Sequence, residues 1–283
     1  MSYFLENPLL IQLIVFASII LFFWALEVII FSQNIKVKAK HSFLNAKFIS
    51  LVLPVQMLFS TMVFMVANWT VSEQWGILQI LPLTEYKLLY FLVAFICIDF
   101  FDYWYHVMMH RVPFFWRFHQ VHHSDMEVDI STTVREHPGE TAIRVSFLAI
   151  IVFILGVPAE FLLIKQFIQS FINLTSHSKV KLSPKVDKIV SWIFVTPSTH
   201  HIHHHYVLPY TDSNYGDILG IWDRIFSTYT SMEQHKIIHG IDTNMDVEEN
   251  SDFKSLISRP FDNSKVHSTN PVYVNRSRLR SVK

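Results

Sequence analysis

Cysteine is almost absent from this 283-residue chain. The single Cys97 cannot form an intrachain disulfide, and it supplies no thiolate set for a structural zinc site. Glycine is also scarce, at six residues, so flexible linkers and low-complexity tracts are not expected. The formal net charge is zero, which gives a nucleic-acid partner no electrostatic support. Hydrophobic residues, by contrast, make up 51% of the chain, a composition typical of a membrane protein.

Long apolar runs predict membrane helices, because a helix needs about 20 apolar residues to cross a bilayer. Such runs occupy residues 8–31, 48–69, the first part of 86–110, and 142–174. The last run is interrupted near Gly156 and Pro158, which predicts two helices joined in a tight hairpin. We therefore expect an all-α integral membrane bundle of about four to five membrane helices, with a helical cytoplasmic cap.

Positive charges between the runs predict the orientation of the chain. The loop after the first run carries four lysines, Lys36, Lys38, Lys40 and Lys47, whereas residues 70–85 carry no Lys or Arg. Because basic loops stay in the cytoplasm, the N-terminus is expected outside and the region after His106 inside. The hairpin returns to the face that it leaves, so everything from His177 onward is also expected inside. We expect N-terminal membrane helices at 1–98, a catalytic domain at 99–230 with its hairpin at 141–176, and a polar cytoplasmic tail at 231–283. The basic end of that tail is expected near anionic headgroups.

Histidines gather in three stretches that follow the apolar runs. His106 and His110 are four residues apart, and two further groups repeat the spacing H-x-x-H-H: His119, His122 and His123, then His200, His203 and His204. On a helix, residues at these spacings lie on one face. His177 ends the returning helix of the hairpin, with Asn173 one turn before it. Isolated histidines are expected to be caps or surface residues: His41, His235, His239 and His267.

These clustered imidazoles predict a metal site. Burying an imidazole without a partner for its nitrogens costs free energy, and neighbouring imidazoles repel one another once they are protonated. A bound metal ion removes both costs. Eight imidazoles exceed the needs of one zinc ion and match two ions with four or five ligands each. The Glu and Glu-x-x-His pattern of carboxylate-rich di-iron bundles is missing, so a pair of irons held by nitrogen is favoured. Spacing alone leaves zinc open.

The histidine stretches resemble those of the fatty acid hydroxylase and sterol desaturase superfamily of integral-membrane di-iron oxygenases. The resemblance covers roughly residues 99–229. "DFFDYWYHVMMH", "HQVHHSD" and "TPSTHHIHHH" are similar to its three histidine boxes. "TTVREHPGE" resembles the Arg-x-His-Pro segment of many bacterial members, and "NYGDILGIWDRIFSTY" resembles the C-terminal motif, with Ser227 where glycine is common.

The resemblance implies a dinuclear centre of two Fe ions, with Zn possible in purified protein. The implied ligands, which are also the catalytic set, are His106, His110, His119, His122, His123, His200, His203 and His204, with His177 as a further metal ligand. The implied activity is hydroxylation or desaturation of a lipid C–H bond with O2 and external electrons. Because the chain holds no flavin or haem motif, a separate donor is implied: a cytochrome b5, a ferredoxin or a pterin. The Arg-x-His-Pro segment favours a bacterial inner membrane over the endoplasmic reticulum.

Four residues are candidates for supporting roles. Asp102 lies four residues before His106 and could hold the second nitrogen of that ring. Arg135 and His137 are expected to orient the hairpin or touch substrate, and Asn173 to act near the metal. In "HHIHHH", His201 could also begin an H-x2-H pair, but we prefer the frame that starts at His200 because it repeats the second box.

Two other classes of protein fit the same residues. A non-enzymatic membrane metal-binding or metal-transport protein would also gather histidines, although transport favours ligands at mid-bilayer on broken helices. A zinc-dependent lipid hydrolase would use the same imidazoles. Metal analysis and oxygen uptake would distinguish these classes from an oxygenase.

Overall fold

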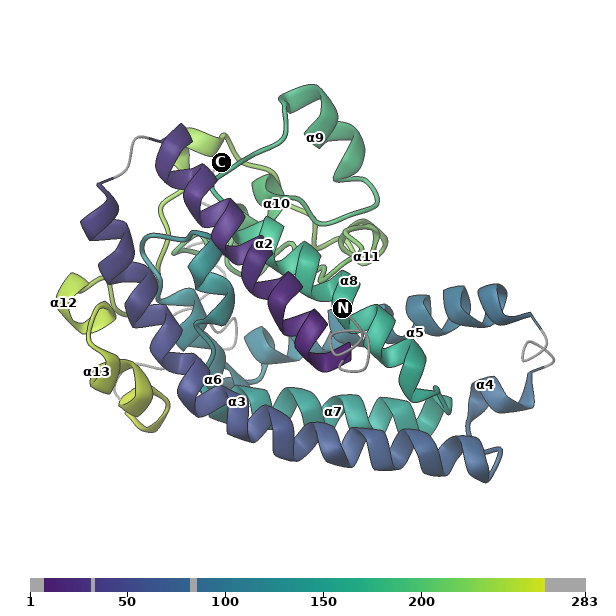
Figure 1. The fold of residues 1–283 in the computed structure, drawn as a ribbon. Helices are drawn as coiled ribbons and strands as arrows, with labels where there is room; N and C mark the ends of the chain where they lie inside the picture. Colours follow the sequence, from purple (N-terminus) through teal and green to yellow (C-terminus); the bar gives the residue numbers. More distant parts are fainter. Residues whose placement is uncertain (1–7, 32–33, 82–85, 263–283) are drawn as a thin grey trace.

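The described part of the chain is helical (Figure 1). The computed structural model describes residues 8–31, 34–81 and 86–262, with side chains from residue 17 onward. The long helices are α2 (Pro8–Ile30), α3 (Ile35–Ser72), α5 (Lys87–Arg111), α7 (Pro138–Leu155) and α8 (Ala159–His177). The shorter helices are α4 (Ile77–Ile80), α6 (Pro113–His123), α9 (Pro184–Val190), α10 (Pro197–His203), α11 (Ile221–Ile225), α12 (Val247–Asn250) and α13 (Phe253–Ser258), with 3-10 turns η1 (Ile130–Val134), η2 (Gln234–Lys236) and η3 (Arg259–Phe261). Over these ranges β pairing is limited to isolated bridges, so the all-α class is confirmed.

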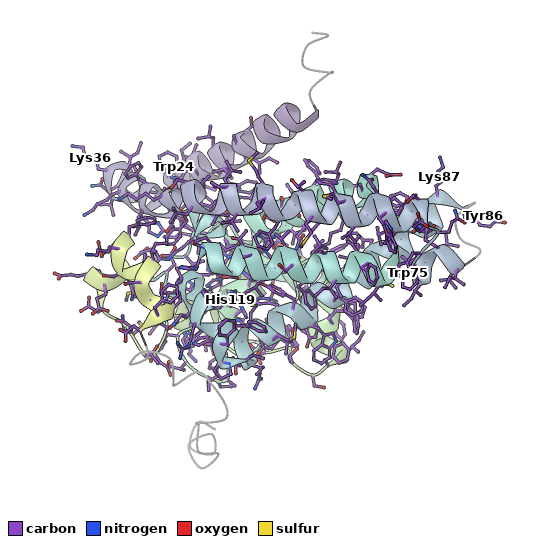
Figure 2. The ribbon with its side chains drawn as sticks, turned by 90° about the horizontal axis from the view of Figure 1, so that it is seen from below. Trp24, Lys36, Trp75, Tyr86, Lys87 and His119 are labelled. Atoms are coloured by element: carbon purple, nitrogen blue, oxygen red, sulfur yellow. The ribbon has the colours of Figure 1, made fainter. Side chains whose placement is uncertain are left out.

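Three candidate membrane spans lie in the described residues: Ile35–Ile80, Lys87–Arg111 and Pro138–Leu155. Figure 2 places Trp75, Tyr86 and Lys87 at one end of the long helices and Lys36 near the other end. The sequence predicted four to five spans. The first predicted run forms α2, which is described with side chains only over Ala17–Ile30. The helix α8 is not among the candidate spans because polar residues, among them Lys165, lower its hydropathy.

The core of the membrane part lies between α3, α5 and α7. α7 lies along the C-terminal half of α3 (Figure 1). Ala67 and Val152 are fully buried in the core that they share with Ala94 of α5. Small and β-branched side chains at these positions allow the helix backbones to approach closely.

The predicted hairpin forms around two glycines. α7 ends at Gly156, whose φ of 73° is left-handed, and α8 begins three residues later. A Cβ on Gly156 would meet the backbone oxygen of Trp75 at 2.1 Å, and a Cβ on Gly76 would meet the Gly156 nitrogen at 2.4 Å. Only glycine fits both the backbone angle and the space at these positions. The two glycines therefore allow the hairpin turn to pack closely against the end of α3. The break that the sequence predicts near Gly156 is therefore where the helix ends.

A buried ion network joins α2 and α3 to the segment that follows the second histidine box. The Lys38 ammonium lies 2.6 Å from a Glu27 carboxylate oxygen and 2.7 Å from an Asp129 oxygen. The other Glu27 oxygen accepts hydrogen bonds from the Ser178 hydroxyl at 2.9 Å and from the Lys179 backbone nitrogen at 2.8 Å. Glu27, the only charged residue of the first apolar run, thus fastens α2 to the end of α8.

Parts of two sequence predictions lie outside the described residues. They are the basic end of the tail, within residues 263–283, and His267. The tail up to residue 262 contains α12, α13 and η3, and Leu256 of α13 is buried against Phe48 of α3.

Replacing Lys38 with methionine should lower the free energy of unfolding by about 3–5 kcal/mol, because it leaves two buried carboxylates without their shared cation. Lys40→Met is the matched control, since Lys40 lies on the same helix and is exposed. Thermal or denaturant unfolding in detergent measures both variants. Equal stability of the two would contradict a structural role for the buried network.

Candidate metal centre

The histidines predicted as ligands converge in two buried groups. In each group, one ligand atom of every residue lies within 4.8 Å of the others. We call the first cluster His106, His110, His119, His123 and His203, and the second cluster His122, His177, His200 and His204. The residues come from α5, α6, α8 and α10 and from the residue that follows α10.

Neighbouring histidines within one box belong to different clusters. In the second box His119 and His123 join the first cluster, whereas His122 joins the second. The third box is used in the opposite sense, because His200 and His204 join the second cluster and His203 the first. Residues four apart lie on one face of a helix, while adjacent residues point about 100° apart. Each H-x-x-H-H box therefore contributes to both clusters.

Backbone carbonyls set the tautomer of four rings. The Nδ1–H of His106 donates to Tyr215 O at 2.8 Å, that of His122 to Arg135 O at 3.2 Å, that of His177 to Asn173 O at 2.7 Å, and that of His203 to Ser213 O at 2.7 Å. A ring that donates through Nδ1 carries its lone pair on Nε2. These four Nε2 atoms are thus prepared to bind a cation.

Hydrogen bonding does not explain the close approach of the His122 and His177 Nε2 atoms. His177 Nε2 lies 2.9 Å from His200 Nε2 and 3.1 Å from His122 Nε2, although both His177 and His122 already donate through Nδ1. Two imidazole nitrogens that meet at a right angle on one ion, each at roughly 2.1 Å, lie roughly 3 Å apart. The observed spacings fit shared ions.

Unsatisfied buried nitrogens support the same conclusion. The Nε2 atoms of His110, His123 and His203 are buried and have no hydrogen-bond partner among the described residues. Leaving a buried polar atom unpaired costs about 1–3 kcal/mol, so three such atoms in one cluster need a common partner. A cation in the first cluster would supply it.

Burial keeps the rings in the neutral form that binds metal. It lowers the pKa of His119 to about 3, with Glu136 opposing the shift. Burial also holds the pKa values of the other box histidines that lie outside the spans well below the ordinary value, and the neighbouring imidazoles add to the shift. These residues are His122, His123, His200, His203 and His204. The rings are therefore uncharged at neutral pH, and a metal ion meets no competing proton.

Glu140 supports the first cluster, a role that no sequence motif indicated. Its carboxylate oxygen lies 2.7 Å from Nδ1 of His119, and its side chain is buried. A carboxylate behind a ligand histidine fixes the ring and raises its basicity. Glu140 follows the Arg-x-His-Pro segment, 21 residues after His119, so only the packing of α7 against α6 brings the two together.

The prediction that Asp102 orients His106 is wrong. Asp102 pairs with Lys165 of α8, and Nδ1 of His106 donates to the Tyr215 carbonyl instead. Asp102 does lie one turn before His106, but its carboxylate reaches the buried ammonium of the neighbouring helix, which it neutralises. Asn173 is close to the second cluster, and the contact there is made by its backbone oxygen, which accepts from His177.

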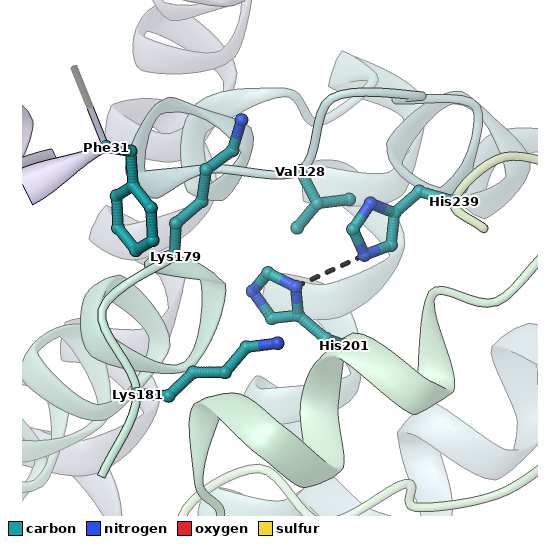
Figure 3. Close-up of a pocket in the computed structure, with 6 residues that line it drawn as sticks. All are labelled: Phe31, Val128, Lys179, Lys181, His201 and His239. Carbon is teal, nitrogen blue, oxygen red and sulfur yellow. Dashed lines mark hydrogen bonds between the residues drawn. The ribbon is translucent and has the colours of Figure 1, made fainter. Parts of the chain in front are cut away.

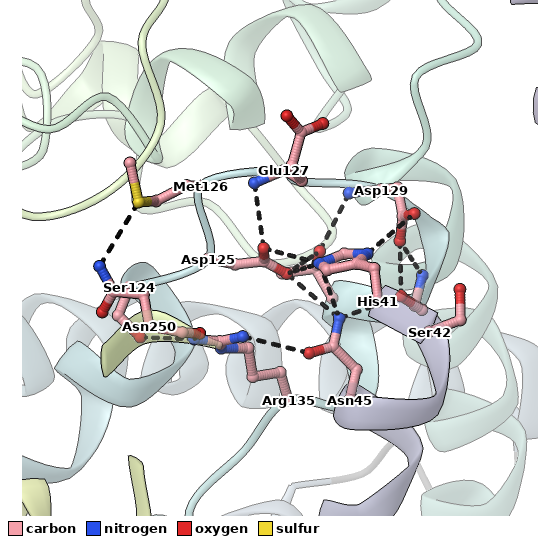
Figure 4. Close-up of polar contacts among 12 residues, drawn as sticks. His41, Ser42, Asn45, Ser124, Asp125, Met126, Glu127, Asp129, Arg135 and Asn250 are labelled. Atoms are coloured by element: carbon pink, nitrogen blue, oxygen red, sulfur yellow. Dashed lines mark hydrogen bonds and ion pairs between the residues drawn. The ribbon is translucent and has the colours of Figure 1, made fainter. Parts of the chain in front are cut away.

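Arg135 and His137 hold the segment that follows the second box. The fully buried Arg135 guanidinium donates to the Val121 and Asn250 carbonyls at 3.0 and 2.9 Å and to the Ser124 hydroxyl at 2.9 Å (Figure 4). His137 caps α7, because its Nδ1 accepts from Gly139 N at 3.0 Å. His137 thus holds the first turn of the hairpin, whereas the Arg135 contacts join α6 to the segment around Asn250. A substrate contact of either residue stays a prediction.

His201 lies outside both clusters. Its Nε2 lies 3.2 Å from the His177 carbonyl, and its Nδ1 lies 3.2 Å from Nε2 of His239 (Figure 3). The two rings help to line a surface cavity of about 270 Å³ together with Phe31, Val128, Lys179 and Lys181. His205 accepts a hydrogen bond from Ile238 N at 3.0 Å. The frame that starts at His200 is the one that reaches the clusters.

His41 is a partly buried partner of two aspartates and not the surface residue that the sequence predicted. One ring nitrogen lies 2.9 Å from Asp125 and the other 3.3 Å from Asp129 (Figure 4). Asn45, one turn later on α3, also donates to Asp125, at 3.2 Å. Asp125 comes two residues after His123, so α3 supports the end of the second box. His239 likewise has a partner in His201, whereas His235 is exposed as expected.

Comparison with known proteins agrees with this geometry. The sequence pattern of the fatty acid hydroxylase family matches residues 91–228, the segment that contains all nine clustered histidines. The matched segment, just under half of the chain, belongs to the fatty acid hydroxylase family. The match begins within α5 and ends after α11, so it includes every helix that carries a histidine of the two clusters.

Relatives in the fatty acid hydroxylase family include lipid monooxygenases. Alkylglycerol monooxygenase of Homo sapiens is 31% identical over 150 residues, covering 52% of this chain and 32% of that protein. The Danio rerio protein of that name is 33% identical over 156 residues, covering 53% and 32%. An ornithine lipid hydroxylase of Rhizobium tropici is 32% identical over 124 residues, covering 44% and 37%. The aligned region spans about a third of the length of these relatives. No solved structure gives a significant match.

Replacing Glu140 with leucine should weaken metal binding at the first cluster by about 10–100-fold, because His119 loses its carboxylate partner. Competition with a chelator measures the affinity. Glu160→Leu, at the exposed start of α8, is the control and should bind as the unaltered protein does. An unchanged affinity for the Glu140 variant would show that His119 needs no carboxylate support.

Metal-free protein should lose stability as the pH falls below about 6.5. Because the folded-state pKa of His119 is about 3, the unfolded chain binds more protons between these values. Each such histidine removes about 1.4 kcal/mol of stability per pH unit over that window. Thermal unfolding of chelator-treated protein from pH 7.5 to pH 5.5 tests this. A flat unfolding temperature would mean that these histidines are not buried without metal, and metal-loaded protein should be more stable throughout.

Proposed function

We propose that this chain is a membrane-bound di-iron oxygenase that hydroxylates a C–H bond of a lipid, using O2 and electrons from a separate donor. The observation that carries the proposal is the pair of buried histidine clusters with Nε2 atoms facing one another. The nine clustered histidines are proposed as the metal ligands, with Glu140 behind His119.

Two points favour oxygenation by iron. The proposed ligands are all imidazole nitrogens, which suit iron, and the described residues add no thiolate to either cluster. The relatives are named as monooxygenases or hydroxylases of lipids, so insertion of oxygen is a better match than desaturation. Their substrates, an alkylglycerol and an ornithine lipid, share an apolar chain and a polar headgroup, and we propose a lipid of that general kind.

Iron bound in the clusters would supply the chemistry of O2 activation, and the protein controls the surroundings. The carbonyls of Tyr215, Arg135, Asn173 and Ser213 hold the rings in the tautomer that binds metal. Burial keeps bulk water away from the clusters, and the fully buried Trp116 packs against His110 with ring centroids 5.0 Å apart. A lipid chain reaches the site from the bilayer around the spans.

The proposed placement follows the charge pattern. The N-terminus lies outside and both clusters face the cytoplasm, where a soluble donor can deliver electrons. A cytochrome b5, a ferredoxin and a pterin are the candidate donors. The Arg-x-His-Pro segment favours a bacterial inner membrane as the host. The catalytic unit is proposed to span residues 99–230, with membrane helices before it and a polar tail after it.

Lipidomics with isotopic oxygen tests the function. Cells that express the chain under 18O2 should gain a lipid with one added 18O atom, and the purified protein should hold two iron ions. His177→Ala removes one proposed ligand and should lower both the iron content and the labelled product, the product by more than about 10-fold. His235→Ala, an exposed control, should change neither.

Three outcomes would contradict the proposal. Product formation that depends on zinc and not on O2 would identify a hydrolase. Two bound irons without any lipid change in cells or in reduced membranes would identify a metal-binding protein. Full activity in the His177 variant would remove that residue from the site.

A further inference from the structure

An apolar surface outside the predicted spans lies on α9, the residues after it, and α11. Within residues 181–194, most side chains are exposed. The exposed apolar members of the surface are Val186 (46%), Ile189 (72%), Trp192 (58%), Ile193 (52%) and Ile225 (57%). Soluble surfaces rarely carry so many large apolar side chains together. We call this set the α9–α11 surface. In Figure 1 both helices lie on the side of the molecule away from the α3–α7 pair.

The charges on this surface are basic. Lys181, Lys185 and Lys188 are exposed, whereas Asp187, the only acidic residue of the stretch, is half-buried. Arg224 of α11 lies between two aromatic rings, with its Cζ 4.1 Å from the Trp192 ring centroid and 3.8 Å from that of Tyr229. Trp, Tyr, Lys and Arg around exposed aliphatic side chains are the residues that gather at a bilayer interface.

The α9–α11 surface is continuous with a membrane span. Phe226, just after α11, has its ring centroid 5.1 Å from that of Trp104 on α5, and Trp222 packs on Phe100 at 5.3 Å. Trp104 is itself 38% exposed. α11 is joined to the α9 segment by a hydrogen bond from the Arg224 guanidinium to the Ser191 carbonyl, at 3.1 Å. The lipid-facing side of α5 therefore extends directly onto α11 and α9.

We propose that the α9–α11 surface docks into the headgroup layer of the bilayer and binds anionic lipid there. The apolar side chains enter the boundary of the acyl region, while the lysines extend to lipid phosphates. A soluble partner is disfavoured, because the surface is continuous with α5 and therefore meets the lipid that surrounds the span. This inference depends on the membrane placement of α5 and not on the proposed oxygenase chemistry.

Docking would also fix the position of the third histidine box. Phe194 forms a bridge with Leu219, and Thr196, two residues later, caps the helix α10 that carries His200 and His203. The Thr196 side chain accepts from Thr199 N, so the chain between the surface and the clusters is short and ordered by hydrogen bonds. A surface held in the interface would therefore keep the second cluster at a constant depth relative to the bilayer.

Spin labels on the full chain test the proposal. A label at Ile189→Cys, in a Cys97→Ser background, is compared with a label at the exposed Glu248→Cys on α12. The protein is placed in nanodiscs of phosphatidylcholine and phosphatidylglycerol, at one copy per disc. Power-saturation measurements should find the label at 189 several-fold more accessible to O2 than to a water-soluble nickel complex. The label at 248 should have the opposite preference.

Two further arms separate the possible occupants. In the labelled protein, Lys185→Glu with Lys188→Glu should reduce the depth of the label in discs with phosphatidylglycerol and have little effect in pure phosphatidylcholine. Equal depth in both lipids would overturn anionic lipid binding. Nickel accessibility at 189 equal to that at 248 would overturn docking altogether. Protection of the label only in discs that hold two copies would assign the surface to a second chain instead.

Discussion

Two imidazole nitrogens that both carry a lone pair cannot form a hydrogen bond with each other, and the structure around the two histidine clusters depends on that constraint. The His122 and His177 rings both donate through Nδ1, so their Nε2 atoms can only accept, yet these two atoms lie 3.1 Å apart. Buried acceptors at this separation repel unless a cation lies between them. A bound cation would remove this repulsion, so we expect the metal-free protein to be less stable.

Rigid support around the clusters follows from the same need. Carbonyls from four segments, the Glu140 carboxylate and the Arg135 guanidinium hold rings or the backbone that carries them. α2 and α3 join this support through Lys38, His41 and Asn45, which reach the two aspartates after the second box. Helices that at first seem to be membrane anchors thus also position the metal centre. Buried charges of this kind persist because each has a partner in place.

The position of the clusters beside the membrane fits a lipid substrate. The chain carries its histidines at the ends of α5 and α8 and on short helices that follow the spans. Relatives of the fatty acid hydroxylase family named as lipid monooxygenases align with this same region. A basic, aromatic and apolar surface on α9 and α11 continues the lipid-facing side of α5 toward the third box. The surface proposed to contact the membrane and the histidines of the third box therefore lie within a few residues of Thr196.

The sequence by itself determined the helical class, the hairpin break at Gly156 and the set of nine histidines that converge. These features depend on local periodicity, on backbone geometry and on spacing along a helix, and residues that are close together in the sequence determine all three. Only the tertiary structure decided that His122 and His123 serve different clusters, that Glu140 lies behind His119, and that Asp102 pairs with Lys165. It also moved His41 from the expected surface to a partly buried ion pair. Such contacts join residues far apart in the chain, and they depend on how helices pack and rotate against one another, which no local pattern specifies.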